Sequence, residues 1–399
     1  MMIPVDDARS LLRHAVPLPA ETVPLASACG RVLRETLAAP HDLPAFDRSA
    51  FDGYAINTGD ASANFEIIAE LRAGAADQLP VGPGQAVRIF TGARLPAPGL
   101  RVVMQEEASF HGERVVLPPG EGNANIRRQG EDARAGEILL HSGTVLNAAA
   151  VALLATLGSP TPRVSRQPRI LHVTTGDEVV PAHQTPAPGQ IRDSNGPLIA
   201  ALLAEQGLPL PRHLHLPDDP AAVERGALAA RESDADLVLV SGGSGPGSHD
   251  LSPLFFEHLG CPVRFRNVNV RPGKPILFGS NERRSAFGLP GNPLSHFVCF
   301  HLFVRPLLRH LQGLAPESFA TGLTAQEMPK TANPRETWIP SIASWETGQP
   351  LVKLTPLRWQ SSGDITRLPA ANALMRIPAE TPALAAGTAV EFLFTRPLS

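Results

Sequence analysis

The feature that most constrains the fold is a pair of short apolar runs at 170–173 and 236–240. Helical patterns at 197–206 and 221–231 follow the first run and precede the second, so both runs are predicted to be buried strands. Strands that alternate with helices form a parallel sheet covered by helices. Ligands bind such sheets at the carboxyl ends of the strands. The glycine-containing loops that follow the two runs are therefore expected at a binding site.

The chain is predicted to contain several domains, because short β-like segments replace the alternating strand and helix pattern on both sides of the α/β region. The α/β domain is placed at 166–315 and includes a long apolar helix at 295–311. The N-terminal α/β and β-rich region, 1–165, is interpreted as two domains, with the β-rich one inserted at about 47–140. Short β-like segments in 316–399 indicate a small, β-barrel-like C-terminal domain. The predicted fold class is multidomain α/β plus β.

Charge and cysteine content exclude several classes of function. The net charge of −3 over 399 residues does not favour nucleic acid as the main partner. The three cysteines give neither a disulfide framework nor a paired zinc spacing. No apolar run reaches the roughly 18–20 residues of a membrane span, and the first residues lack a signal-peptide pattern. We expect a cytoplasmic protein that binds neither nucleic acid nor membrane.

Acidic and glycine-rich loops follow the two predicted strands. Gly176–Glu178 places two carboxylates where they could hold a metal or a ribose hydroxyl, or simply form a turn with a helix-capping acid. Ser241–Gly247 contains four glycines, whose backbone can approach a phosphate closely, although a flexible connection would look the same. Asp250 and the pair Asp218–Asp219 suggest Mg²⁺ beside phosphates, unless they are solvated loop acids.

Two rigid turns could hold an oxyanion. Arg271–Pro275 sets two cations around a tight turn whose prolines fix the backbone. Gly288–Ser295 opens the long apolar helix, and a helix N-terminus attracts anions. Helix capping alone would also explain Asn292 or Ser295.

The β-rich region has its own candidates. Phe46–Tyr54 contains the only tyrosine and two acids in an otherwise apolar context. Thr91 and a charged loop at 125–132 follow. Each of these segments could also be a solvated turn.

Taken together and in this order, these segments resemble the molybdopterin molybdenumtransferase family, which includes the bacterial MoeA proteins and the E domain of gephyrin. A single match would mean little, but nine in one order cover nearly the whole chain. Residues 360–363 and 371–374 also resemble the last domain of the family. The nine matches are Phe46–Tyr54, Thr91–Ala93, Val102–Glu106, Asn125–Gly136, Thr175–Glu178, Gly189–Asn195, Ser241–Gly243, Pro272–Pro275 and Gly288–Ser295.

The resemblance implies an elongated homodimer with four domains per chain and a three-layer, molybdopterin-binding type of α/β domain. It also implies the reaction, in which adenylylated molybdopterin and molybdate give molybdenum cofactor and AMP, assisted by Mg²⁺. The pterin dithiolene supplies the sulfur ligands, so no cysteine is needed at the site. The resemblance further implies a possible transient contact of the protein with molybdoenzymes or their chaperones.

The loops and the resemblance together suggest four groups of site residues. The expected catalytic residues are Asp52, Thr91, Asp177, Glu178 and Asp250. Those expected to bind the pterin and phosphates are Gly176, Ser241, Gly242, Gly243, Asp218 and Asp219. Those expected to bind molybdate are Arg271, Lys274, Pro275, Ser295, Arg335, Ser361 and Ser362. The expected ligands of Mg²⁺ are Asp250 and Glu178.

The sequence departs from the family pattern at a few positions. Gly245 stands at a serine position, Ser248 at an acidic one, and Asn267 at a frequent lysine. These departures bear on Mg²⁺ affinity and on the rate of phosphoanhydride cleavage more than on the fold. The altered glycine loop motivates an alternative, a paralogue that binds pterin or nucleotide but transfers metal poorly.

The residues leave two other functions and the role of Asp52 to consider. An adenylyltransferase would need only the α/β unit, so the additional domains argue against it. A scaffold role would call for an interaction linker, and no segment resembles one. Asp52 is expected to serve a cleft shared between two subunits, or else to cap the turn before Gly53.

Overall fold

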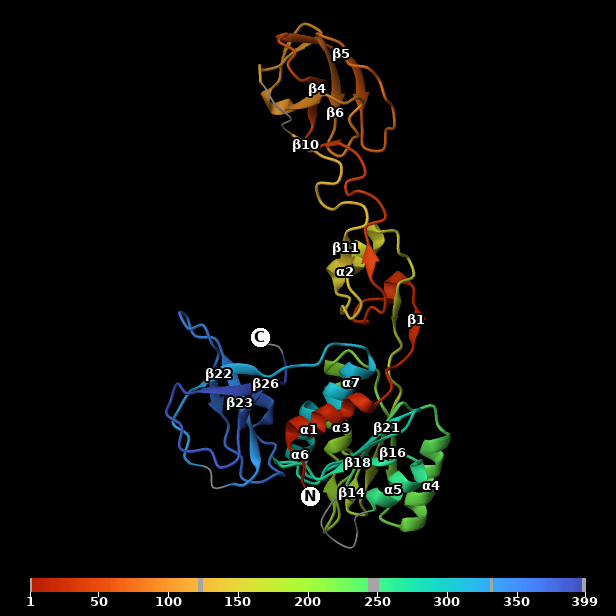
Figure 1. Cartoon of the computed structure of the whole chain (residues 1–399), viewed down its shortest axis with the longest axis vertical. Helices are drawn as coiled ribbons and strands as arrows, with labels where there is room; N and C mark the ends of the chain where they lie inside the picture. The colour runs from red at the N-terminus through yellow and green to blue at the C-terminus, as the bar shows by residue number, and fades with distance from the viewer. Residues whose placement is uncertain (1, 121–124, 243–250, 331–332, 397–399) are drawn as a thin grey trace. The chain divides into compact units, whose positions relative to one another are not determined.

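The computed structural model describes residues 2–120, 125–242, 251–330 and 333–396 (Figure 1). The chain forms two compact units. The first contains Met1–Arg34, Gly143–Asn147 and Thr161–Ser399, and the second contains Glu35–Ser142 and Ala148–Pro160. Within the described residues no helix is long and apolar enough to cross a membrane.

A mixed sheet forms the centre of the first unit, with the strand order β16-β13-β17-β21-β20-β18. The first four of these strands are parallel, whereas at one edge β20 pairs antiparallel with β21, and β18 pairs antiparallel with β20. Every residue of β13 and β17 is buried, as expected for strands covered on both faces. The predicted parallel-rich sheet is therefore confirmed. Its strands are β16 (Arg212–Leu216), β13 (Ile170–Thr175), β17 (Leu237–Ser241), β21 (Ser285–Leu289), β20 (Leu277–Ser280) and β18 (Val263–Arg266).

Helices cover both faces of this sheet and make the three layers (Figure 1). On one face, α4 (Pro220–Glu232) and α5 (Ser252–Leu259) pack on Val173, Val238 and Val240. Leu239, Phe287 and Leu289 point to the opposite face. The helices that cover this face are α1 (Val5–Leu11), α3 (Asn195–Glu205), α6 (Pro293–Cys299) and α7 (Arg305–Leu311).

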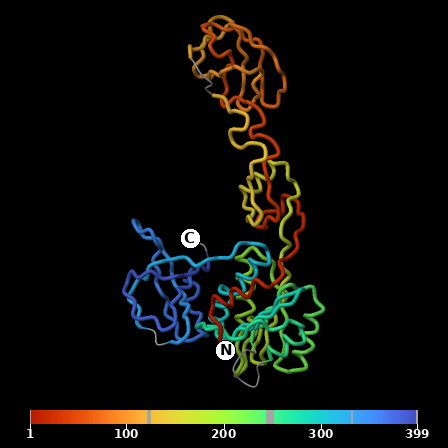
Figure 2. The backbone as a smooth tube through the Cα atoms, in the orientation of Figure 1, coloured from red at the N-terminus to blue at the C-terminus, as the bar shows by residue number. Residues whose placement is uncertain are grey.

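The long helix predicted at 295–311 is present but irregular. A π-helical segment, Phe300–Val304, joins α6 to α7. Pro306 follows at the start of α7, and a proline has no backbone N–H to continue a regular ladder. The N-terminal segment runs back along α7, where Leu18 N donates to Leu311 O at 2.7 Å (Figure 2). His310 also contacts Ala15 O at 2.8 Å.

The C-terminal segment of the first unit forms a closed β-barrel. Among the described residues its strands follow the order β23-β24-β22-β26-β25, and β25 returns to β23. Strand β19 (Val270–Arg271) pairs with β23 and so joins the barrel to the turn that begins at Arg271. The predicted β-barrel-like domain is confirmed. Its strands are β22 (Ala320–Thr324), β23 (Glu336–Ser344), β24 (Lys353–Pro356), β25 (Ala373–Ile377) and β26 (Ala389–Phe394).

The second unit is β-rich, as predicted. Its main sheet has the order β7-β4-β6-β5-β9-β8, and helix α2 (Ala148–Thr156) belongs to the same unit. Gly53 opens β4, and a Cβ there would lie 2.0 Å from Val103 O, so only glycine fits after Asp52. The strands are β4 (Gly53–Asn57), β5 (Asn64–Leu71), β6 (Gln85–Ile89), β7 (Leu100–Met104), β8 (Ser109–His111) and β9 (Arg114–Val116).

Candidate functional site

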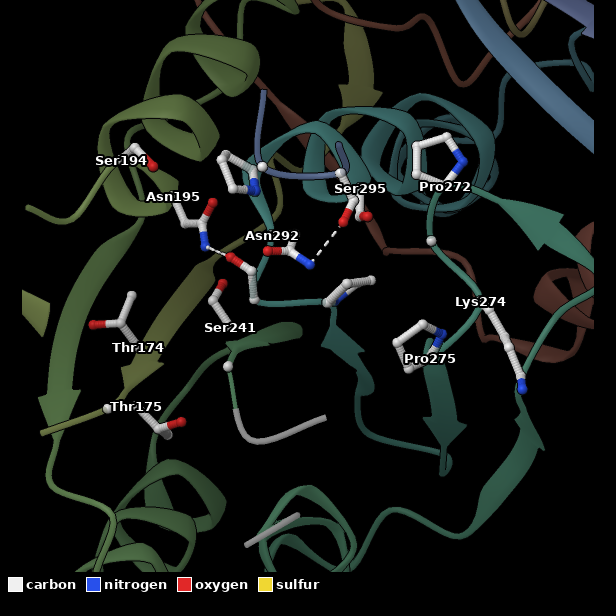
Figure 3. A pocket seen from close by; sticks show the side chains of 18 of the residues that line it. Thr174, Thr175, Ser194, Asn195, Ser241, Pro272, Lys274, Pro275, Asn292 and Ser295 are labelled. Atoms are coloured by element: carbon white, nitrogen blue, oxygen red, sulfur yellow. Dashed lines mark hydrogen bonds between the residues drawn. The ribbon is translucent and has the colours of Figure 1, made fainter. Parts of the chain in front are cut away.

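A cavity of about 1250 Å³ lies at the carboxyl ends of β13 and β17 (Figure 3). It brings together most of the predicted site residues of the first unit, although they come from sequence positions far apart. Those that line it are Gly176, Glu178, Asp218, Ser241, Gly242, Arg271, Lys274, Pro275, Ser295, Arg335, Ser361 and Ser362. Gly243 and Asp250 lie outside the described residues.

Two glycine turns meet at one end of the cavity. Gly242 has a φ of +96°, and a Cβ on it would lie 2.7 Å from Thr175 O. Gly176 has a φ of +134°, and a Cβ there would lie 2.9 Å from the Glu178 carboxylate. Both positions therefore require glycine, and both line the cavity.

Carboxylates surround these turns. Glu178 and Asp218 line the cavity, while Asp177 Oδ1 accepts a hydrogen bond from Asp218 N at 3.1 Å and so ties the two loops together. Asp219 caps α4, because its Oδ2 accepts from Ala222 N at 2.8 Å. No group of three or more potential metal ligands is preformed in the part of the chain that the structure describes.

Glu178 and Asp218 nevertheless suit Mg²⁺. This ion prefers carboxylate oxygens, keeps several waters and shares substrate phosphates instead of requiring an all-protein cage. Two carboxylates beside backbone that can accept a phosphate match that donor set.

Cations lie along another wall of the cavity, on the turn Arg271–Pro275. The Arg271 guanidinium stacks over the Trp359 ring at 5.2 Å, which fixes its position. Lys274 O accepts from Val268 N at 3.1 Å and from Ile276 N at 2.9 Å, so the turn is held on both sides. Figure 3 shows Pro272, Lys274 and Pro275 on this turn, beside the start of α6.

The buried side chain of Cys299 packs against this turn at Gly273. A Cβ on Gly273 would lie 2.6 Å from its Sγ, and Cys299 Sγ donates to Gly273 O at 3.6 Å. Burial raises the pKa of the Cys299 thiol and, to about 11, that of Cys261. Both thiols stay protonated at neutral pH, so neither supplies a thiolate to the cavity.

A barrel loop is tied to the start of α6. Asn292 Nδ2 donates to Ser362 Oγ at 2.8 Å, and Leu294 N donates to Ser362 O at 3.0 Å. Asn292 makes no side-chain capping bond to its helix, so capping does not account for it. Hydrogen bonds from Thr366 and from Gln360 N lower the pKa of Asp364, which anchors the loop that carries Ser361.

Asp52 and Thr91 belong to the second unit, where they contact each other. The Asp52 carboxylate accepts from Thr91 N and Thr91 Oγ1, both at 2.7 Å. These two bonds lower the pKa of Asp52 below its ordinary value, so the exposed carboxylate is held in its charged form.

Sequence reasoning missed two features of the site. Asn195 donates through Nδ2 to Gly291 O at 2.7 Å, while its Oδ1 and the hydroxyl of Thr175 are buried with no partner among the described residues. His172 and His296 are both fully buried against Ser241. A histidine inside the apolar run at 170–173 was the one signal that could have pointed to them.

Comparison with known proteins decides the family. Residues 3–158 match the family model for the MoeA N-terminal region (domain I and II), 172–310 the probable molybdopterin binding domain, and 323–395 the MoeA C-terminal region (domain IV). The chain is 31% identical to the molybdopterin molybdenumtransferase of Staphylococcus aureus (strain Mu50 / ATCC 700699) over 98% of its own length and 96% of the relative's. The chain belongs to the MoeA family of molybdopterin molybdenumtransferases.

Other members of the MoeA family match as fully. The chain is 33% identical to the molybdopterin molybdenumtransferase of Bacillus subtilis (strain 168), over 99% of this chain and 94% of the relative. The crystal structure of the molybdopterin biosynthesis MoeA protein from Pyrococcus horikosii covers 100% of both chains with a TM-score of 0.83 and 26% identity. Matches on both sides of the α/β unit argue against the adenylyltransferase alternative.

Proposed function

We propose that this transferase inserts molybdate into adenylylated molybdopterin, giving molybdenum cofactor and AMP with the assistance of Mg²⁺. The supporting observation is a single cavity that carries carboxylates and glycine turns beside a rigid cationic turn. A substrate with a phosphoanhydride and a second, small oxyanion substrate require these two kinds of surface. The membership of the MoeA family supports the same reaction.

The molybdate site is proposed at the cationic turn. Arg271 and Lys274 flank it, and Arg335 adds a third cation from the barrel side. Hydroxyl donors complete the set, because Ser295 sits in the first turn of α6 and the loop with Ser361 and Ser362 is bonded to that helix. Arg271 and the loop with Ser362 are held in place before binding, and fixed donors stabilise an oxyanion without a reorganisation cost.

The phosphates and Mg²⁺ are proposed at the glycine turns. Glu178 and Asp218 would hold the ion, which when bound neutralises charge on the phosphates. The backbone at Gly176 and Gly242 can approach the phosphates closely, and Asp177 keeps the two loops together. Asp250 is proposed as a further ligand of Mg²⁺ and Gly243 as part of the phosphate site, although both residues lie outside the described residues.

The remaining proposals concern assembly and cell context. We propose a homodimer in which Asp52, oriented by Thr91, acts in the site of the partner subunit. Transient contact with molybdoenzymes or their chaperones in the cytoplasm would deliver the product. The paralogue alternative rests on the segment 244–249, which lies outside the described residues.

A reconstitution tests the reaction. Purified protein, adenylylated molybdopterin, molybdate and Mg²⁺ are mixed, and AMP release and molybdenum cofactor are measured separately. We expect both products, and we expect omission of molybdate or of Mg²⁺ to suppress cofactor formation. Tight binding of the pterin with no cofactor formed would support the paralogue instead.

A further inference from the structure

Ser241, the last residue of β17, lies between two buried histidines. Its Oγ is 2.5 Å from His172 Nε2 and 3.3 Å from His296 Nε2. His172 comes from the neighbouring strand β13 and His296 from helix α6, and neither side chain is exposed to solvent. Figure 3 shows the Ser241 side chain among the residues that line the cavity.

The protonation of His296 follows from its second contact. Its Nδ1 lies 3.1 Å from Pro290 O, and a carbonyl oxygen can only accept a hydrogen bond. Burial lowers the pKa of His296 to about 4, although Pro290 O and the charge of Asp193 act in the other direction. A neutral ring has one proton, which must therefore be on Nδ1. The bare Nε2 then accepts the hydroxyl proton of Ser241.

The protonation of His172 follows in turn. Burial, with His296 and His213 nearby, lowers the pKa of His172 far below its ordinary value, so this ring is also neutral. Because the Ser241 proton already goes to His296, the 2.5 Å contact requires an N–H on His172 Nε2. His172 Nδ1 is then a bare acceptor, and it is buried with no partner among the described residues. The opposite tautomer would bury an unpaired N–H, which proteins avoid more strictly.

We propose that His172 and His296 act as positioning residues that make Ser241 a hydrogen-bond acceptor toward the substrate. The hydroxyl gives its proton to one ring and accepts a proton from the other, which leaves one lone pair. A phosphate oxygen carries no proton to share with that lone pair. Ser241 therefore accepts a hydrogen bond from a donor group of the bound molecule, which is a hydroxyl, a ring N–H or an amine. The phosphates are bound by the backbone of the glycine turns instead. That the bound molecule is adenylylated molybdopterin rests on the proposed function.

The tautomers can be measured without any substrate. Nitrogen-15 NMR of the imidazole rings distinguishes the two neutral tautomers and the charged form, and single histidine variants assign the signals. At pH 7 we expect the Nδ1–H tautomer for His296 and the Nε2–H tautomer for His172. An Nδ1–H signal from His172, or an imidazolium at either position, would overturn the proposal.

Ligand binding tests the acceptor role of Ser241. In S241A, the affinity for inorganic pyrophosphate should stay within about twofold, while the affinity for adenylylated molybdopterin, followed by pterin fluorescence, should fall about tenfold, as expected for one lost hydrogen bond. A tenfold loss for pyrophosphate would show that the hydroxyl donates to phosphate. An unchanged affinity for both ligands would show that Ser241 does not contact the substrate. A wild-type protein with the expected tautomers and affinities but no cofactor formation would contradict the proposed reaction and leave this inference standing.

Discussion

At the scale of single residues, some charged side chains at the cavity are held by contacts, while one cationic side chain can move. Arg271 is held by Trp359, and Asp177 is bonded to the neighbouring loop. Lys274 is different, because its backbone is held by two hydrogen bonds while its side chain is exposed at the cavity. The turn therefore presents a flexible ammonium group from a rigid base, which suits capture of a small anion.

Lys274→Ala should weaken molybdate binding without affecting folding. A hydrogen bond to a charged group contributes about 1.5–3 kcal/mol, so we expect the Kd for molybdate to rise roughly 10- to 100-fold. Isothermal titration calorimetry measures the Kd, and thermal unfolding checks the fold. Lys353→Ala is the matched control, because Lys353 pairs with Glu346 on the barrel and does not line the cavity. Equal affinities for wild type and Lys274→Ala would remove Lys274 from the site.

His296 should make folding stability depend on pH. Its folded pKa of about 4 lies below the ordinary value of 6.5, so between these pH values the unfolded chain binds a proton that the folded chain does not. Stability therefore rises with pH through this window, and acidification from 6.5 to 4 costs about 3 kcal/mol from this group. His296→Phe should make the free energy of unfolding, measured by urea denaturation, depend less on pH between 4.5 and 7, while the buried His172 and His301 keep part of the dependence. An unchanged pH dependence would mean that His296 does not titrate with folding.

At the scale of elements, the fold class could be predicted because each buried strand is a short apolar run. The helices predicted at 197–206 and 221–231 correspond to Asn195–Glu205 and Pro220–Glu232. These patterns are local, and local periodicity is what a single sequence records. The candidate residues at the strand ends could be proposed because glycine and proline mark loops there, whereas Arg335, Ser361 and Ser362 are proposed from the resemblance to the family.

The features that could not be predicted depend on contacts between distant segments. Asn292 bonds Ser362, which is 70 residues away, and neither position carries a local signal of that contact. The pairing of β19 with β23, which joins the barrel to the cationic turn, is equally non-local. His172 and His296 come from a strand and a helix that only the tertiary fold places on either side of Ser241.

The glycine turns give a prediction at this scale. Gly242→Ala places a Cβ 2.7 Å from Thr175 O at a φ of +96°, so the loop must shift, at a cost of about 1–3 kcal/mol. We expect a lower unfolding temperature and weaker binding of pyrophosphate. Gly291→Ala is the control in the same cavity, because the nearest atom to its Cβ would be 3.8 Å away. Equal effects of the two substitutions would argue against a special role for the Gly242 backbone.

At the scale of the whole molecule, the structure supports one composite site within the first unit. The α/β sheet supplies the glycine turns, β19 leads into the cationic turn, and the barrel adds Arg335 and the loop with Ser361. The full-length match to MoeA relatives shows that this combination of domains is the family's own. Asp52 and Thr91 belong to the second unit, and their part in the reaction is a proposal about the assembled protein.

Mixing two inactive chains tests that proposal. Asp52→Asn should be inactive, because it removes a carboxylate that two hydrogen bonds from Thr91 hold in its charged form. Lys274→Ala should be inactive at low molybdate. If Asp52 acts in the partner's site, a heterodimer of the two variants contains one site with both residues intact and one site that lacks both.

Co-refolding the two variants should therefore restore part of the cofactor formation, measured on heterodimers purified through two different affinity tags. Each variant refolded alone is the control and should stay inactive. If both residues acted within one chain, every site of the heterodimer would lack one of them, and no activity would return. The absence of recovery in verified heterodimers would thus place Asp52 in the site of its own chain or restrict it to holding the turn before Gly53. Recovery would instead require that the catalytic unit is the dimer, since neither variant chain contains a complete set of residues.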